Sequence, residues 1–149
     1  MKLNEQGYKL IAKHEGLRLK PYLCPARVPT IGYGNTYYAD GKRVTMQDKP
    51  ITREQAYELL KIIADKFARQ VDAVVTATVT QNQFNALVSF AYNIGMGNFR
   101  KSTLLRMVNL SPHNASIRAQ FMRWNKAGGV ELRGLTNRRI DEANLYFTK

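Results

Sequence analysis

Three side chains near the N-terminus have the types and spacing that acid–base or nucleophilic chemistry could use. Glu15, Cys24 and Thr30 follow one another at short intervals, in a stretch that also holds glycines, prolines and aromatic residues. A carboxyl group can donate a proton, a thiolate can act as base or nucleophile, and a hydroxyl can hold a water molecule. Each also has a structural interpretation: a solvated helix-end carboxylate, a small buried hydrophobe and a strand threonine. The surrounding sequence must decide between these interpretations.

The composition predicts one domain, residues 1–149, with an excess of positive charge. The 23 Lys and Arg residues against 11 Asp and Glu residues give a net charge of +12. Such a charge favours a polyanionic partner, whether nucleic acid, an anionic membrane or an acidic cell-wall polymer. The single cysteine excludes an internal disulfide, and two histidines are too few for a typical structural zinc site. The C-terminal third is especially basic, with Arg123, Lys126, Arg133, Arg138 and Arg139.

The first residues do not resemble an export signal. They contain no apolar core and no small-residue cleavage site, so we expect no signal peptide and synthesis in the cytoplasm. No stretch of the chain approaches the roughly 18 apolar residues that a membrane span requires.

The periodicity predicts an α+β, predominantly helical fold of two lobes. A short amphipathic helix over residues 3–14 is followed by a segment rich in Pro and Gly, which indicates a small β-lobe at about 17–48. That lobe should hold two or three short strands, with a hairpin turn at Asp40 and Gly41. Residues 1–14 and 53–149 are expected to form the larger helical lobe.

Capping patterns mark the starts of several helices in the larger lobe. Thr52 to Gln55 and Thr80 to Gln83 both match a capping box. The first opens a helix of 20 residues or more that should join the lobes, and the second opens an apolar helix that should lie at the centre of the core. Further helices are expected after Ser102, over 115–126 and over 135–146. A cleft between the two lobes would suit an extended ligand.

The string EGLRLKPYLCPARVPTIGYGNT resembles the active-site signature of the phage-type lysozymes, or endolysins, a family of glycoside hydrolases. That signature is Glu, eight residues, Asp or Cys, five residues, Thr, and residues 16–23 and 25–29 supply the two intervals. Two downstream segments, TQNQFNALVSFAYNIG and GLTNRRIDEANLY, are similar to the core helix and last helical segment of the family. The resemblance therefore covers nearly the whole chain, and it implies a lysozyme-like arrangement of the two lobes.

The resemblance implies hydrolysis of the β-1,4 bond between N-acetylmuramic acid and N-acetylglucosamine in peptidoglycan. Such a reaction needs a proton donor and a second group that activates water or captures the oxocarbenium-like centre. Glu15 is the expected donor if burial keeps it protonated, Cys24 stands at the second acid's position, and Thr30 would hold the attacking water. No metal and no organic cofactor are expected. The candidate substrate-binding residues are Tyr22, Tyr33, Asn35 and Gln81.

A cysteine at the second acid's position changes the expected pH dependence. An ordinary thiol with a pKa of ~8.5 is only slightly ionised at neutral pH, whereas an aspartate is almost fully charged. Lys20 and Arg27 lie close in sequence and could raise the thiolate fraction. We therefore expect activity that rises toward mildly alkaline pH, with Cys24 acting as base or nucleophile.

Residues outside the signature can also be assigned to the cleft or to the core of a lysozyme-like fold. Phe90, Asn93 and Gly95 are expected in the far wall of the cleft or in the core behind it, and Phe90 and Trp124 are assigned to the core.

The family implies a monomer that acts on peptidoglycan strands, with no stable protein partner and no nucleic acid. It also implies synthesis in the host cytoplasm and access to the periplasmic cell wall after a separate holin permeabilises the membrane.

Four alternatives remain open from the residues alone. A cysteine–histidine hydrolase would use His14 or His113, but no orienting third group stands at a recognisable spacing. The basic surface would equally suit a nucleic-acid-binding domain without enzymatic activity. A basic helix that carries Trp124 could disturb membranes. A lytic transglycosylase, which forms a 1,6-anhydro product without water, would result if Thr30 holds no water.

Overall fold

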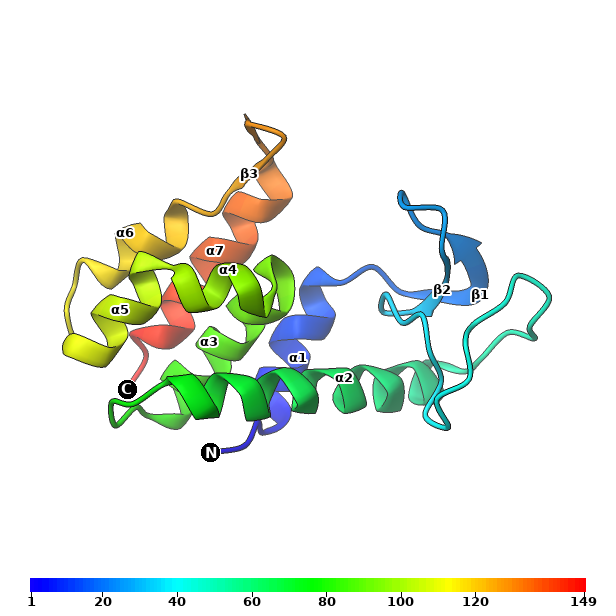
Figure 1. Cartoon of the computed structure of the whole chain (residues 1–149), viewed down its shortest axis with the longest axis horizontal. Helices are drawn as coiled ribbons and strands as arrows, with labels where there is room; N and C mark the ends of the chain where they lie inside the picture. Colours follow the sequence, from blue (N-terminus) through cyan, green and yellow to red (C-terminus); the bar gives the residue numbers. More distant parts are fainter.

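In a computed structural model of the whole chain, residues 1–149, a small β-lobe lies beside a larger helical lobe (Figure 1). The predominantly helical α+β fold that the sequence predicts is confirmed. The helices are α1 (Glu5–His14), α2 (Arg53–Val74), α3 (Gln81–Ile94), α4 (Met96–Lys101), α5 (Thr103–Leu110), α6 (Ile117–Met122) and α7 (Arg133–Tyr146). The strands are β1 (Arg18–Leu23), β2 (Pro29–Gly32), β3 (Lys126–Ala127) and β4 (Val130–Glu131).

The predicted capping residues start the helices as expected. The Thr80 hydroxyl accepts a hydrogen bond from the Gln83 backbone N–H at 3.1 Å, and the Gln83 side chain accepts one from the Thr80 N–H at 2.9 Å. Thr52 and Gln55 form the same reciprocal pair at the start of α2. Ser102 caps α5 through the Leu105 N–H. Each cap satisfies backbone donors that the first turn of a helix leaves unpaired.

Helix α3 is the centre of the hydrophobic core. Every residue from Gln83 to Ala91 is buried, and α1, α2 and α7 pack around the helix. Phe90 is fully buried, with its ring in edge-to-face contact with Phe99, Phe121 and Trp124. The core assignments of Phe90 and Trp124 are therefore confirmed, although Trp124 is only half-buried at the edge of the cluster.

The β-lobe contains one regular antiparallel pair, in which Tyr22 of β1 lies opposite Thr30 of β2. A tight turn follows, in which Ile31 and Asn35 exchange both backbone hydrogen bonds at 2.9 Å. Gly32 and Gly34 have φ values of 69° and 93° in this turn, and glycine adopts that region without a steric penalty.

The predicted hairpin around Asp40 does not form regular strands. Only an isolated bridge joins Tyr37 to Arg43, with Gly41 in the turn at a φ of 85°. The turn residues are therefore where the sequence places them. The residues on each side of the turn have no further strand to pair with. An isolated two-stranded hairpin is only marginally stable, so the pairing does not extend beyond the bridge.

Helix α2 runs from the β-lobe into the helical lobe along the bottom of the view in Figure 1. Strand β2 packs against its first half, while α1, α3 and α4 pack against the helix in the larger lobe. The long joining helix is thus present as predicted. None of the helices combines the length and the apolar character that a membrane span would need.

Two segments of the helical lobe differ from the sequence prediction. Helix α6 covers only Ile117–Met122 of the expected 115–126, because the chain then turns into the short hairpin of β3 and β4. Gly128 and Gly129 form the tip of that hairpin, both with positive φ, and two such residues in succession favour a tight reversal over a helix. The final helix begins at Arg133, two residues before the expected start.

Candidate active site

Glu15 lies at the point where α1 ends and the chain turns toward β1. Its backbone N–H closes the last turn of the helix on the Ile11 carbonyl at 3.1 Å, while its own backbone is extended, with φ −99° and ψ 128°. The helix therefore ends at Glu15 itself. Gly16 does not adopt the left-handed conformation that a glycine often has just after a helix. The Glu15 side chain is 24% exposed, so the carboxylate is sheltered by the fold and still open to solvent.

Arg138 of α7 binds the Glu15 carboxylate. Its Nη1 atom donates to Glu15 Oε1 at 2.8 Å, and its Nη2 atom donates to the Ser89 carbonyl of α3 at 3.1 Å. The Arg138 side chain is only 3% exposed. Three helices thus meet at one guanidinium group, which fixes the position of the glutamate carboxylate relative to the core.

A second carboxylate lies behind Arg138. The fully buried Glu142 accepts hydrogen bonds on Oε2 from Arg138 Nε at 3.2 Å and from the Ser89 hydroxyl at 2.5 Å. Arg139 Nε lies 2.9 Å from Glu142 Oε1 in an ion pair without hydrogen-bond alignment. Arg139 also donates to Asn93 Oδ1 at 2.7 Å. Two arginines therefore face two glutamates in this cluster.

Burial controls the ionisation of this cluster. Complete burial raises the pKa of Glu142, and the guanidinium groups of Arg139 and Arg138 oppose that shift. Burial lowers the pKa of Arg139 to about 10, while the Glu142 carboxylate acts in the opposite direction. Such a group of charges is stable in the interior only because its members neutralise one another.

Cys24 follows the last residue of β1, in the turn that leads into β2. Its N–H donates to the Val28 carbonyl at 3.1 Å, and its carbonyl accepts from the Arg27 N–H at 2.7 Å. The side chain is a free thiol and is half-buried. Arg27 has a φ of 62°, so the turn holds a non-glycine residue in the left-handed region. Cys24 is therefore part of a tight turn at the end of the sheet, and it is not a core residue.

Hydrogen bonding at this turn favours the thiolate. The pKa of Cys24 is lowered first by a backbone hydrogen bond with Val28. Desolvation opposes this effect, and smaller hydrogen-bonding contributions, which include the Thr30 hydroxyl, add to the lowering. The cause differs from the one expected from sequence, because the main causes are hydrogen bonds of the turn and not the charges of Lys20 and Arg27. The expectation of a raised thiolate fraction is supported in its direction, with the backbone as its source.

Thr30 lies beside Cys24, at the start of β2. Its hydroxyl donates to the Val28 carbonyl at 2.8 Å, and the residue is 3% exposed. A hydroxyl carries one proton, so it donates either to Val28 or to the Cys24 sulfur, and its lone pairs remain open to accept. The structure therefore brings Cys24 and Thr30 together, as the sequence spacing suggests.

The two tyrosines predicted to bind substrate lie in the β-lobe with different surroundings. Tyr22 is half-buried, with the guanidinium carbon of Arg18 4.9 Å from its ring centre. Tyr33 occupies the glycine-flanked turn and packs against the edge of the hydrophobic core. Their substrate contacts remain predictions.

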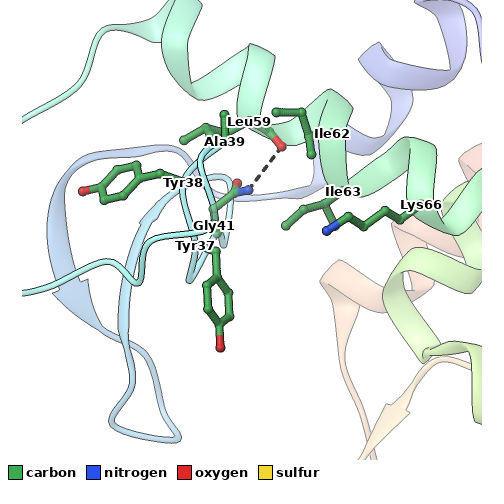
Figure 2. Close-up of a pocket in the computed structure, with 9 residues that line it drawn as sticks. Tyr37, Tyr38, Ala39, Gly41, Leu59, Ile62, Ile63 and Lys66 are labelled. Carbon is green, nitrogen blue, oxygen red and sulfur yellow. Dashed lines mark hydrogen bonds between the residues drawn. The ribbon is translucent and has the colours of Figure 1, made fainter.

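Asn35 has a structural contact in place of an exposed position. It is 1% exposed, and its Nδ2 atom donates to the Leu59 carbonyl of α2 at 3.2 Å. Asn35 also lines a pocket of about 290 Å³. Figure 2 shows this pocket between the loop from Tyr37 to Gly41 and the side of α2 that carries Leu59, Ile62, Ile63 and Lys66. This amide therefore attaches the β-lobe to α2 in the structure, and its substrate contact remains a prediction.

Gln81 is not brought to the site. Its Nε2 atom donates to the Lys2 carbonyl at 2.8 Å and to Asn85 Oδ1 at 2.9 Å. The carbonyl that shares Arg138 with Glu15 belongs to Ser89, two turns further along α3, which is about 12 Å along the helix axis. Gln81 therefore begins α3 at the end away from Glu15, and nothing in its surroundings supports the predicted substrate contact.

His14 is paired with a carboxylate of α7 and not with the thiol. Its Nε2 atom lies 2.8 Å from Asp141 Oδ2 of α7, and Lys13 pairs with the same carboxylate at 2.8 Å. Desolvation lowers the pKa of His14, with the Asp141 hydrogen bond acting in the opposite direction. His14 and Asp141 thus join α1 to α7 beside Glu15, which leaves no histidine contact to support a cysteine–histidine hydrolase.

The residues that sequence reasoning missed are on α3 and α7. Ser89 and Glu142 received no role, and Arg138 and Arg139 were considered only for their positive charge, although the last three residues belong to the segment GLTNRRIDEANLY that carried part of the resemblance. Arg138 and Arg139 were assigned to a basic surface, and that assignment is wrong because both are buried. The available signal was an adjacent arginine pair with Glu142 four and three residues further along, the spacing at which side chains meet on a helix.

No group of three or more His, Cys, Asp or Glu side chains is arranged to hold a metal ion. The site is therefore described by its own side chains: a sheltered glutamate paired with a buried arginine, and a thiol with a threonine hydroxyl at the end of a small sheet.

A helical lobe and a small β-lobe, with a paired glutamate at the end of the first helix, define a protein of the lysozyme fold. A sequence model of the phage lysozyme family matches residues 12–142, and the chain belongs to that family. An endolysin of Bacillus phage PZA is 42% identical over 151 residues, which is 98% of this chain and 55% of that protein. An endolysin of Acyrthosiphon pisum secondary endosymbiont phage 1 is 37% identical and covers 98% of both chains.

Solved structures agree with this assignment. An endolysin from Escherichia coli O157:H7 phage FAHEc1 has a TM-score of 0.88 at 38% identity, over 99% of this chain and 94% of that one. The muramidase domain of SpmX from Asticaccaulis excentricus has a TM-score of 0.85 at 32% identity and covers 99% of both. The chain spans about half the length of the Bacillus phage endolysins it matches, at 55% of each.

Proposed function

We propose that this protein is a muramidase that hydrolyses the β-1,4 bond between N-acetylmuramic acid and N-acetylglucosamine in peptidoglycan. Glu15 donates a proton to the leaving oxygen, and Cys24, as a thiolate, activates water or captures the oxocarbenium-like centre. Thr30 accepts a hydrogen bond from the attacking water. The family membership of the chain and the names of its relatives support this activity.

The observation that carries the proposal is the position of Glu15. Its carboxylate is held by a buried arginine at 2.8 Å and keeps 24% of its side-chain surface open to solvent. A general acid needs a fixed direction toward the leaving group and access to substrate, and this arrangement offers both. Surface glutamates without such a partner would have no fixed direction.

The second role is supported by the turn that holds Cys24. Its hydrogen bonds lower the pKa of the thiol and so raise the thiolate fraction, and a thiolate is the form that acts as base or nucleophile. Thr30 is fixed beside it by its bond to the Val28 carbonyl. Cysteine therefore substitutes chemically for the aspartate that the family signature also allows at this position.

The test is the release of new reducing ends from purified peptidoglycan. The native protein should release them, Glu15→Gln should reduce the rate by at least about 100-fold, and Cys24→Asp should keep it. Glu131→Gln, which removes the same charge from the exposed β4 strand, is the matched control. A native protein that releases no reducing ends, or a Glu15→Gln variant with full activity, would contradict the mechanism.

Product mass distinguishes hydrolysis from transglycosylation. A hydrolase adds one water to each cleaved bond, whereas a transglycosylase leaves a 1,6-anhydro end that is one water lighter. Because the Thr30 hydroxyl can still accept a hydrogen bond from water, we favour hydrolysis. If 1,6-anhydro ends were the main product, the protein would be a lytic transglycosylase and not a hydrolase.

The cellular setting follows from the same proposal. We infer a monomer that is made in the host cytoplasm and reaches the periplasmic wall after a holin opens the membrane. Expression with and without a holin, followed by culture turbidity, tests this route. Lysis that is equally fast in both cultures would exclude holin dependence.

A further inference from the structure

The guanidinium of Arg138 is held from two sides before it reaches Glu15. Its Nε atom is bound to Glu142 within α7, and its Nη2 atom is bound to the Ser89 carbonyl on α3. Only Nη1 is directed at the glutamate carboxylate, at 2.8 Å. Because the guanidinium group is planar and rigid, fixing two of its corners determines where the third one points.

Glu142 is the group that makes this arrangement possible. It lies four residues after Arg138 on the same face of α7, is fully buried, and also accepts the Ser89 hydroxyl. Without its carboxylate, two buried arginines would have Glu15 as the one remaining carboxylate partner in this cluster. A buried cation without a partner is costly, so Arg138 would then be drawn more strongly to Glu15.

We propose that Glu142 is a positioning residue for the proposed reaction, which fixes the Arg138 guanidinium so that a single N–H binds the Glu15 carboxylate. Glu142 does not touch the substrate in this arrangement. It divides the positive charge of Arg138 between two carboxylates, so that one N–H of the guanidinium holds Glu15 in place. This inference rests on the proposed function, because it assigns Glu142 to the same site.

The charged and titratable groups around this cluster come from three helices. On α7 they are Arg138 and Arg139, and on α1 the group is Glu15 itself. Helix α3 contributes Tyr92, whose pKa is raised by burial and then by the nearby Glu15 charge. His14 and Asp141 form a pair next to Glu15 without a hydrogen bond or ion pair to Glu142, and desolvation, with a smaller contribution from the Arg138 charge, lowers the pKa of His14. The removal of the Glu142 charge therefore acts on Glu15 mainly through Arg138.

The direction of the effect follows from this arrangement. In Glu142→Gln the amide keeps the size of the side chain and an oxygen acceptor but removes the negative charge. Arg138 then acts on Glu15 alone and stabilises its ionised form. A difference in the titration of Glu15 between Glu142→Gln and the native protein, toward lower pH in the variant, is therefore the expected result of the experiment below. Turnover number should fall about fivefold or more with little change in KM, since substrate contacts are not altered.

The decisive measurement is NMR of protein labelled with isotope in the glutamate carboxyl carbons. The Glu15 signal is assigned by its loss in Glu15→Gln, and its midpoint is compared between the native protein and Glu142→Gln. Glu131→Gln is the matched control, because it removes the same charge from an exposed position of the same lobe. Reducing-end release supplies kcat and KM for each variant.

Ser89→Ala provides a second, smaller change in case Glu142→Gln fails to fold. It removes the hydroxyl that binds Glu142 Oε2 and leaves every charge in place. A lower turnover with an unchanged KM supports the inference, and native turnover in folded Ser89→Ala then contradicts it.

The outcomes separate the inference from the function on which it rests. A shifted Glu15 midpoint and lower turnover in Glu142→Gln, with native values in Glu131→Gln, support the inference. A midpoint within about 0.2 unit of the native value in folded Glu142→Gln overturns it, and so does a shifted midpoint with native turnover. If the native protein itself releases no reducing ends, the proposed function fails, and the midpoint alone decides the role of Glu142.

Discussion

Arg138 Nη1 lies 2.8 Å from Glu15 Oε1, although 123 residues separate the two in sequence. The pair joins the last helix of the chain to the end of the first. A general acid at the end of a helix would otherwise swing freely, because the chain leaves the helix at that residue. The contact thus makes the position of the proposed proton donor a property of the whole helical lobe.

Replacement of Arg138 by lysine should reduce activity strongly. A lysine ammonium is a single point charge and cannot bind Glu142, Ser89 and Glu15 from fixed corners. Misplacement of a catalytic carboxylate of this kind costs about 10- to 100-fold in turnover. Reducing-end release by Arg138→Lys measures the effect, and Arg118→Lys on exposed α6 is the control. Equal turnover in the two variants would show that the planar arrangement of N–H donors in Arg138 is unimportant for activity.

Replacement of Cys24 by aspartate should change the pH dependence of the reaction. Hydrogen bonds lower the pKa of Cys24, so the native activity should rise with pH as the thiol ionises, below the pH at which an ordinary thiol does so. Aspartate is ionised above about pH 4, so the acid limb of the profile should move down by several pH units in Cys24→Asp. Activity profiles between about pH 4 and pH 9 measure the shift, because this range includes the ordinary pKa values of a carboxyl group and of a thiol.

Cys24→Ala is the companion variant for that experiment. It should lose at least about 100-fold in rate, since neither a base nor a nucleophile remains at the position. Superimposable profiles for native protein and Cys24→Asp, or full activity in Cys24→Ala, would exclude the thiolate from the mechanism.

Gly7 and Gly134 should respond oppositely to alanine, although both are helical. A Cβ atom at Gly7 would lie 2.7 Å from Asn85 Oδ1 and 2.7 Å from Leu3 Cδ2, which forces α1 away from α3. Gly7→Ala should lower the free energy of unfolding by about 1–3 kcal/mol. Gly134→Ala meets no atom within 4 Å and should be neutral or stabilise by up to about 1 kcal/mol. Urea unfolding of both variants checks the contrast, and equal effects would contradict it.

Truncation of Phe90 should be among the most damaging core changes. The side chain is fully buried among three other aromatic rings, and Arg139 lies 4.9 Å from its ring centre. Phe90→Ala should cost about 3–5 kcal/mol of unfolding free energy. Leu110→Ala is the comparison, because Leu110 is 81% exposed and its loss should change stability by no more than about 0.5 kcal/mol. A cost below about 1 kcal/mol at Phe90 would show that the site collapses around the cavity.

The sequence alone determined the local features of this protein. Capping pairs such as Thr80 and Gln83 predict helix starts, since the bonds that form them join residues three apart. The apolar run after Thr80 predicts the central helix because an all-apolar surface must be buried. The spacing of Glu15, Cys24 and Thr30 could be read directly, and the tight turn brings Cys24 and Thr30 together.

Only the tertiary structure decided which side chains act on those residues. Arg138 was noted only for its positive charge and Glu142 received no role, and the burial of both depends on how α7 packs against α1 and α3. Gln81 and Asn35 have suitable types for substrate contacts, but the direction of α3 places the first away from Glu15, and the second donates its amide to the Leu59 carbonyl of α2. Pairing between residues far apart in sequence follows from the simultaneous packing of several helices. A pattern along one segment does not contain that information.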